Sequence, residues 1–292
     1  LAVTPQQVHQ LMIGLPETGK TTFLAALWHV LCAAETPASL ELIELHGNRE
    51  YLNKIADQWC RCERQDRTSL SNPETVSIRV REPRTGDTAE LCIPDMSGES
   101  FELQWEAREC SLDFAKLARN ASGVLLFIHP DATKETDSIA EANEVLTAWA
   151  PEAGETESKE GDPPDVPWKA RNVPTQVKIV DLVQSLRLLS TATLRVAVIV
   201  SAWDLVLDVV RPEEWLKRRL PLLHQYLVAN QESVISRVFG VSAQGGRLED
   251  ANKLLEEAVA SKRVKVVGAD TAEHDITAPL RWLMSGGTAD NE

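Results

Sequence analysis

Residues 14–21 read GLPETGKT and match the phosphate-binding pattern GxxxxGK(S/T). In such a loop, successive backbone N–H groups surround an anion, and the helix that follows adds unpaired donors and the positive end of its dipole. Gly14 and Gly19 permit backbone conformations that a Cβ would forbid. We expect Lys20 to reach the β- and γ-phosphates of a nucleotide and the Thr21 hydroxyl to ligate Mg²⁺.

The neighbours of these four residues complete the predicted phosphate site. The remaining expected contacts are Leu15, Pro16, Glu17, Thr18 and Thr22. The apolar segment 8–13 before the loop predicts a short buried strand, and segment 22–31 after it predicts a helix. Strand, loop and helix in this order form the context that the motif requires. The alternative is a glycine-containing turn that only caps a core helix.

The composition excludes several classes of protein. The chain has 292 residues, of which 43% are hydrophobic and 25% charged, as is usual for a globular protein. Its net charge of −14 would repel a phosphate backbone, so we expect no nucleic-acid partner. No apolar run approaches the ~18 residues of a membrane span. The five cysteines have no CxxC spacing, and we expect reduced thiols and a cytoplasmic location.

Alternating strand and helix patterns predict an α/β fold with a doubly wound, mostly parallel sheet. The expected strands are 75–80, 89–94, 123–128, 195–200, 234–241 and 264–267. The expected helices are 48–64, 101–119, 133–149, 176–189, 213–228, 248–260 and 277–284. Segment 40–45 fits either a short strand or a turn of helix. Pro221 is expected to bend or split its helix.

The predicted domain organisation is a single domain over residues 1–292 with one insertion. The insertion covers about 131–192 and consists of a helix, a linker and a second helix. Its linker, residues 151–174, is rich in Pro, Glu, Asp and Gly, which predicts a flexible surface segment.

Asp95-Met96-Ser97-Gly98 directly follows the predicted strand 89–94. A DxxG sequence at a strand end, downstream of a phosphate loop, resembles the Ras-like (TRAFAC-type) P-loop GTPase fold, whose motifs follow strand ends in a fixed order. The resemblance implies that Asp95 holds Mg²⁺ through water and that the Gly98 N–H contacts the γ-phosphate.

Two departures from that pattern concern hydrolysis. Glu99 stands where the family often has a glutamine that positions water, and Pro16 stands where glycine is common. A carboxylate near the γ-phosphate and a narrower loop make us expect slow hydrolysis, or hydrolysis that needs a partner protein.

Ser201-Ala202-Trp203-Asp204 follows the predicted strand 195–200, at the place of the guanine-reading (N/T)KxD motif. The resemblance implies that Asp204 accepts from the guanine N1–H and N2–H₂ groups. Ala202 replaces the expected lysine, and we include the adjacent Trp203 among the nucleotide contacts. The alternative for Asp204 is a helix N-cap.

Ser242-Ala243-Gln244 resembles the SAK motif after the next strand, in which a backbone N–H meets the guanine O6. The resemblance makes Ser242 and Ala243 expected nucleotide contacts. A threonine in the loop before the strand 75–80 should complete the Mg²⁺ shell; we choose Thr68, with Thr75 as the alternative. Arg67 beside it is either an arginine finger in cis or a solvated loop arginine.

Several longer segments narrow the resemblance. They are GLPETGKTTFLAALW, IPDMSGESFELQWEAR, GVLLFIHPD, SAWD and HDITAPLRWL. Together they are similar to the bacterial double-GTPase family, which has been proposed to act in multi-component conflict or defence systems. The resemblance implies a molecular switch that binds GTP with Mg²⁺, hydrolyses it, and regulates partner proteins. A nucleotide-binding scaffold with little hydrolysis and an ATPase of the same fold remain alternatives.

Overall fold

The structure is a computed structural model that describes residues 7–65, 76–93, 98–133, 173–190, 193–207 and 211–285. Within these residues eight strands form one sheet. The strands are β1 (Gln7–Gly14), β2 (Glu41–His46), β3 (Val76–Arg81), β4 (Thr88–Ile93), β5 (Ala121–Ile128), β6 (Leu194–Ser201), β7 (Val234–Ser242) and β8 (Lys265–Val267). Their order across the sheet is β2-β3-β4-β1-β5-β6-β7-β8.

The middle of the sheet is parallel, and its two sides are antiparallel. Strands β4, β1, β5, β6 and β7 lie side by side in this order and pair in parallel with one another. Strands β2, β3 and β4 form an antiparallel ladder on one side, and β8 pairs antiparallel with β7 on the other. The prediction of a mostly parallel α/β sheet is therefore confirmed. All parallel strands have their carboxyl ends at the same edge, where open α/β sheets bind ligands.

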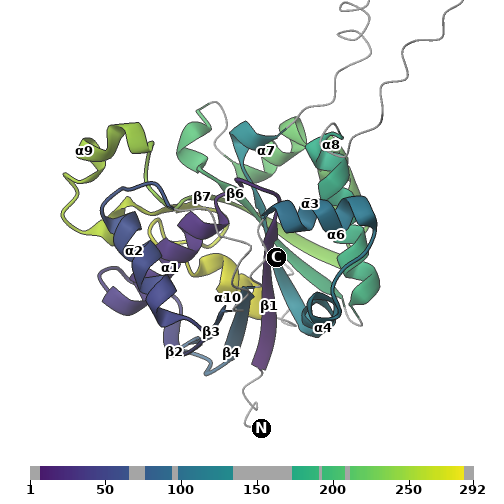
Figure 1. The fold of residues 1–292 in the computed structure, drawn as a ribbon, viewed down its shortest axis with the longest axis horizontal. Coiled ribbons are helices and arrows are strands. Elements are labelled where there is room, and N and C mark those ends of the chain that lie inside the picture. Colours follow the sequence, from purple (N-terminus) through teal and green to yellow (C-terminus); the bar gives the residue numbers. More distant parts are fainter. Residues whose placement is uncertain are drawn as a thin grey trace, which may run out of the picture.

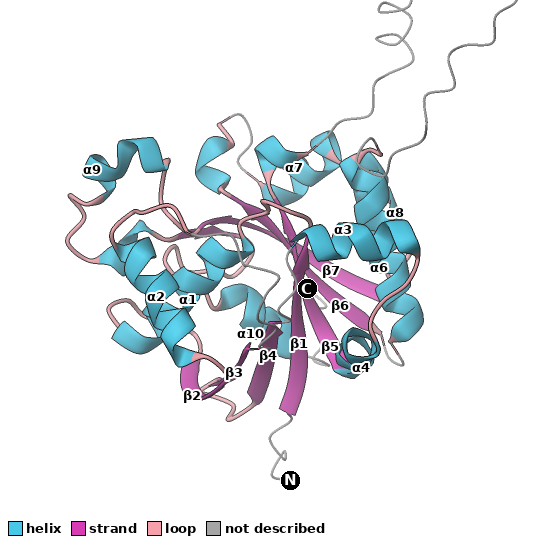
Figure 2. Cartoon of the chain, in the orientation of Figure 1, coloured by secondary structure: helices cyan, strands magenta, loops and turns pink. Residues whose placement is uncertain are grey.

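Helices cover both faces of the sheet (Figures 1 and 2). One face is covered by α1 (Lys20–Ala33), α2 (Arg49–Cys60) and α10 (Ala278–Met284). The other is covered by α3 (Gly98–Ala107), α4 (Leu112–Asn120), α6 (Thr175–Leu189), α7 (Pro212–Arg219) and α8 (Pro221–Ala229). Within the described helices, none has an apolar stretch long enough to cross a bilayer.

The side chains of successive strand residues point alternately into the hydrophobic cores on the two faces of the sheet. On β1, Met12 packs with the helices of the first face and Ile13 with those of the second. Leu125 and Leu126 on β5 divide in the same way. Because strand side chains alternate between faces, a strand covered on both sides must be apolar throughout. This explains the uninterrupted apolar runs in the sequence.

Most predicted elements are confirmed. Segment 40–45, for which the sequence left a choice, is the strand β2. The helix predicted over 213–228 is split before Pro221 into α7 and α8. The predicted helix 133–149 and linker 151–174 lie almost entirely outside the described residues, so the domain organisation stays a prediction.

The segment 101–119 contains two helices rather than one largely continuous helix. Arg108, with φ +58°, follows the end of α3 in the left-handed region. The Ser111 side chain then caps α4 by accepting a hydrogen bond from the Phe114 N–H at 3.2 Å. A serine N-cap is a strong signal for the start of a helix, but the apolar periodicity continues across residues 107–112 and did not indicate the break.

The helix predicted over 248–260 is wrong. This stretch begins with a 3₁₀ turn, Leu248–Asp250, followed by α9, which covers only Ala251–Leu254. Leu248 and Leu255 are 36% and 50% exposed. A helix in a protein is stabilised chiefly by packing of an apolar face, and this segment buries none.

The edges of the sheet differ in length. At one edge β2 is largely exposed, and Glu41 forms an ion pair with Arg81 of β3 at 3.0 Å. At the other edge β8 has three residues.

A buried polar contact fixes the end of α2 to the loop that follows β7. The fully buried Trp59 donates its indole N–H to the Ala243 carbonyl at 2.9 Å. The Arg263 guanidinium lies over the Trp59 ring, 4.6 Å from its centroid, and donates to the Trp59 carbonyl at 3.2 Å. The Trp59 bond therefore ties the Ala243 loop to the end of α2, and Arg263 holds the Trp59 side chain in position.

We predict that Trp59→Phe lowers the free energy of unfolding more than Trp28→Phe, by about 1–2 kcal/mol, because it leaves a buried carbonyl without this donor. Trp28 is the matched control: it is equally buried, but its indole N–H bonds to the exposed Asn53 at 2.9 Å. That partner can turn to water. Urea unfolding followed by circular dichroism measures both variants, and equal losses would contradict the assigned role of the Trp59 N–H.

Candidate phosphate and base site

The phosphate loop joins the end of β1 to the start of α1, and its two glycines have steric reasons to be there. Gly19 has φ +81°, a left-handed conformation that glycine adopts without strain. A Cβ built on Gly14 would come within 2.7 Å of the Thr18 hydroxyl and 3.0 Å of Phe127. Larger residues at either position would therefore distort the loop.

Lys20 lies in the first turn of α1 and points back into the loop. Its ammonium donates to the carbonyls of Gly14 (2.7 Å) and Leu15 (2.8 Å). Burial lowers the pKa of Lys20 to about 8, and the Glu99 carboxylate acts in the opposite direction. Phosphate oxygens can replace the two neutral carbonyls and would bind the ammonium more strongly, because they are charged.

The other loop residues differ in their placement. Thr18 is buried, and its hydroxyl donates to the Leu15 carbonyl at 2.9 Å, so it stabilises the loop itself. Glu17 is exposed with φ +59°, and Pro16 is half-buried. Within the described residues the Thr21 hydroxyl makes no hydrogen bond, which leaves it available to a ligand.

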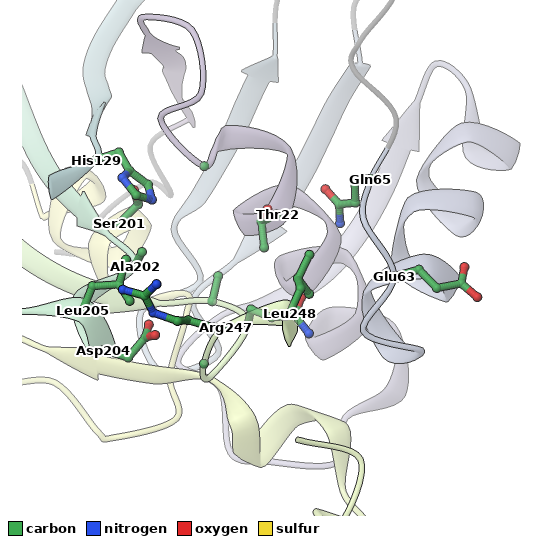
Figure 3. Close-up of a pocket in the computed structure, with 14 residues that line it drawn as sticks. Thr22, Glu63, Gln65, His129, Ser201, Ala202, Asp204, Leu205, Arg247 and Leu248 are labelled. Carbon is green, nitrogen blue, oxygen red and sulfur yellow. The ribbon is translucent and has the colours of Figure 1, made fainter. Parts of the chain in front are cut away.

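A cavity of about 240 Å³ opens beside the phosphate loop (Figure 3). Gly19 and Thr22 line it at the loop end, while Ala202, Asp204 and Ala243 line it from the segments after β6 and β7. Its volume lies near the lower bound of roughly 300 Å³ for small-molecule sites. A base with its sugar fits such a cavity when the phosphates lie outside it on the loop.

Asp204 and Ser242 come from two separate motifs and are joined by a hydrogen bond. The Ser242 hydroxyl donates to Asp204 Oδ1 and accepts from the Gly245 N–H at 3.2 Å. Ala202 occupies the N-cap of the 3₁₀ turn Trp203–Leu205, so the interpretation of Asp204 as an N-cap is wrong. The carboxylate is instead held in the cavity wall by the second motif.

The Trp203 side chain, expected to contact the nucleotide, lies in the core. It is 9% exposed and packs on the face that carries α7 and α8. A Cβ built on Gly240 would come within 2.4 Å of the indole ring, so the ring lies directly against the β7 backbone. The cavity wall is formed by its neighbours Ala202 and Asp204.

The loop carrying the expected O6 contact is fixed from α2. Gln244 donates through Nε2 to the Trp59 carbonyl and to Cys62 Sγ, both at 3.3 Å. With the Trp59 bond to the Ala243 carbonyl, three hydrogen bonds hold this loop. Ala243 therefore meets the cavity with a defined backbone position.

Sequence reasoning missed several lining residues, among them Gln65, His129, Ser201 and Arg247. His129 and Ser201 stand at the ends of β5 and β6, so position at the carboxyl edge of a parallel sheet was the signal available. Burial lowers the pKa of His129, while nearby carboxylates act in the opposite direction. Nothing in the local sequence of Gln65 or Arg247 marks them.

Four residues proposed for switch roles lie outside the described residues: Arg67, Thr68, Thr75 and Asp95. Gly98 is the first residue of α3, and Glu99 is exposed in its first turn. The Lys20 ammonium lies 6.0 Å from the centroid of the Phe101 ring in the same helix, so the start of α3 lies close to the phosphate loop. Within the described part, no group of three or more His, Cys, Asp or Glu side chains could hold a metal.

The solved structures that are similar to this chain include the following two. One is that of the bacterial selenocysteine-specific elongation factor EF-Sec, with 12% identity, a TM-score of 0.33, and coverage of 86% of this chain and 29% of that chain. The other is that of sup35 complexed with GDP, with 14% identity, a TM-score of 0.33, and coverage of 84% and 39%. The chain thus spans well under half the length of either. No curated protein sequence matches it.

A model of the Double-GTPase 1 family matches residues 11–283, which is most of the 292 residues. The match contains the phosphate loop and both motifs that line the cavity, and it supports a GTP-binding function. The chain therefore belongs to the Double-GTPase 1 family of P-loop GTPases.

Proposed function

We propose that this protein binds GTP with Mg²⁺, hydrolyses it to GDP and phosphate, and acts as a switch for partner proteins in a bacterial multi-component conflict or defence system. The observation that carries the proposal is the Asp204 carboxylate, held by Ser242 in the wall of a cavity that begins at Gly19. A carboxylate there can accept two hydrogen bonds from guanine, whereas adenine offers no matching pair of donors.

The phosphate loop would bind the other end of the nucleotide. Backbone N–H groups at the start of α1 and the Lys20 ammonium supply the positive potential in a protein of net charge −14. In this proposal the phosphates lie on residues 14–21 and the base lies at Asp204.

The residues that would hold Mg²⁺ are Thr21 together with Asp95 and Thr68. The Thr21 hydroxyl, in the first turn of α1, has no hydrogen-bond partner among the residues that the structure describes and fits an oxygen-ligated ion. Mg²⁺, when bound, would neutralise charge on the β- and γ-phosphate oxygens. Thr21 directly follows Lys20 in the first turn of α1. Its hydroxyl would therefore hold the ion close to the phosphates that the Lys20 ammonium contacts.

Hydrolysis would depend on Glu99, with Arg67 as a candidate arginine finger. Glu99 lies in the first turn of α3, the helix whose Phe101 ring is 6.0 Å from the Lys20 ammonium. In the proposed complex its carboxylate would be near the γ-phosphate and could orient water. The same negative charge opposes a triphosphate, and this favours a second candidate function, a nucleotide-binding scaffold with little hydrolysis.

Single-turnover hydrolysis separates these two functions. We expect radiolabelled phosphate to be released from GTP in the presence of Mg²⁺, slowly or only with a partner protein added. Release no faster than in buffer, with GTP bound and even with the partner protein present, would leave the scaffold. Calorimetry with GDP and ADP tests the base assignment independently, and tighter ADP binding would overturn it.

We predict that Asp204→Ala removes the preference for GDP over IDP, which lacks the 2-amino group. A hydrogen bond to a charged carboxylate contributes about 1.5–3 kcal/mol, so the wild-type ratio of affinities should be roughly 10- to 100-fold. The ratio should fall to about one in the variant. Calorimetric titration measures it. Asp131→Ala, an exposed aspartate outside the cavity lining, is the control and should keep the ratio.

We predict that the affinity for a non-hydrolysable GTP analogue falls about fourfold between pH 7 and 8.5, because Lys20 with a pKa of about 8 loses its charge over this range. Phosphates favour the charged form and raise that pKa in the complex, so binding takes up protons. Calorimetry in buffers of different ionisation enthalpy measures the uptake. Lys20→Met should bind weakly with no such pH dependence, and an equal dependence in this variant would contradict the assignment.

A further inference from the structure

Ala202 lines the cavity close to Asp204, the carboxylate that would bind the base. Its backbone is in the left-handed region with φ +45°, and its side chain is a methyl group, which carries no charge and no hydrogen-bonding atom. A flat base bonded to Asp204 along its edge still needs contacts on its two faces, because edge hydrogen bonds leave the rings open to water.

Arg247 lines the same cavity from another part of the chain. It follows Gly246 in the segment after β7, and in Figure 3 its side chain extends toward Ala202 and Asp204. Among the described residues that line the cavity, it is the one whose side chain always carries a positive charge. Leu205 and Leu248 line the cavity beside it.

The guanidinium of Arg247 forms no hydrogen bond or ion pair within the described part of the chain. Arg263 shows the contrast. It is 5% exposed and donates to the carbonyls of Cys60 (3.2 Å), Trp59 (3.2 Å) and Ala260 (3.3 Å). Arg263 therefore stabilises the fold, whereas Arg247 has no structural partner there.

The backbone on both sides of Arg247 is fixed. Two residues before it, Gly245 has φ +90° and donates to the Ser242 hydroxyl, and a Cβ there would come within 2.6 Å of the Arg263 carbonyl. After it, the Arg247 carbonyl accepts from the Asp250 N–H at 3.1 Å. The loop thus holds the Cα of an exposed arginine at the rim of the cavity.

We propose that the Arg247 guanidinium stacks on the face of the guanine base and supplies the cation that the Ala202 position lacks. The inference rests on the proposed function, because it requires a base at Asp204. The guanidinium is planar and weakly hydrated, which suits it to stack on an aromatic ring. Its charge also offsets the Asp204 carboxylate, which stands on the same wall.

The test compares GDP affinities of Arg247→Ala and Arg247→Lys by calorimetry. We expect Arg247→Ala to lose roughly 3- to 30-fold in affinity, the range of a cation stacked on an aromatic ring. The loss should be the same for GDP and IDP, because stacking does not involve the 2-amino group. Arg247→Lys keeps the charge without the plane and should lose less. Arg84→Ala, an equally charged loop residue 79% exposed on the β3–β4 turn, should bind as the wild type does.

Inorganic tripolyphosphate, which has no base, separates stacking from a phosphate contact. Measured by competition with GDP, the affinity for tripolyphosphate should be the same in the wild type and in Arg247→Ala. If Arg247→Ala lost as much affinity for tripolyphosphate as for GDP, the stacking role would be overturned. Unchanged GDP affinity in Arg247→Ala would also overturn it while leaving the proposed function intact. Failure of the wild type to bind GDP would overturn both.

Discussion

The parallel pairing of β1, β5, β6 and β7 is the constraint on which the candidate site depends. It places the carboxyl ends of four strands at one edge, although these strands are separated by long stretches of chain. The phosphate loop, His129 and Asp204 follow those ends, and Ser242 is the last residue of β7. If the register were lost, the loop that would bind phosphates and the carboxylate that would bind the base would no longer face one cavity.

Buried polar contacts then refine what the sheet positions approximately. The bond between Ser242 and Asp204 joins the loops after neighbouring strands, and Trp59 ties one of these loops to a helix on the sheet face. Such bonds are costly to break, because a buried group left without a partner keeps its desolvation penalty. Exposed ion pairs such as Arg81 with Glu41 contribute little by comparison.

The sequence predicted the features that depend on local pattern. The phosphate loop, the buried strands and the two strands β3 and β4 follow from motif spacing and periodicity, and they are confirmed as structure. Features set by tertiary packing could not be predicted from the local sequence in the same way. Trp203 is turned into the core by the space above Gly240, and the segment after Leu248 lacks a surface against which a helix could pack. Gln65 and Arg247 reach the cavity from loops whose paths no periodicity encodes.

The edges of the sheet have a consequence for self-association. An edge strand offers free N–H and C=O groups to any extended chain, and this is a common route to fibrils. On β2, Glu41 and Glu44 form ion pairs with side chains of the neighbouring strand β3, Arg81 and Arg79 respectively. At the other edge, β8 has only three residues and is too short to pair with an added strand. Cross-β growth through this sheet is therefore disfavoured at both edges.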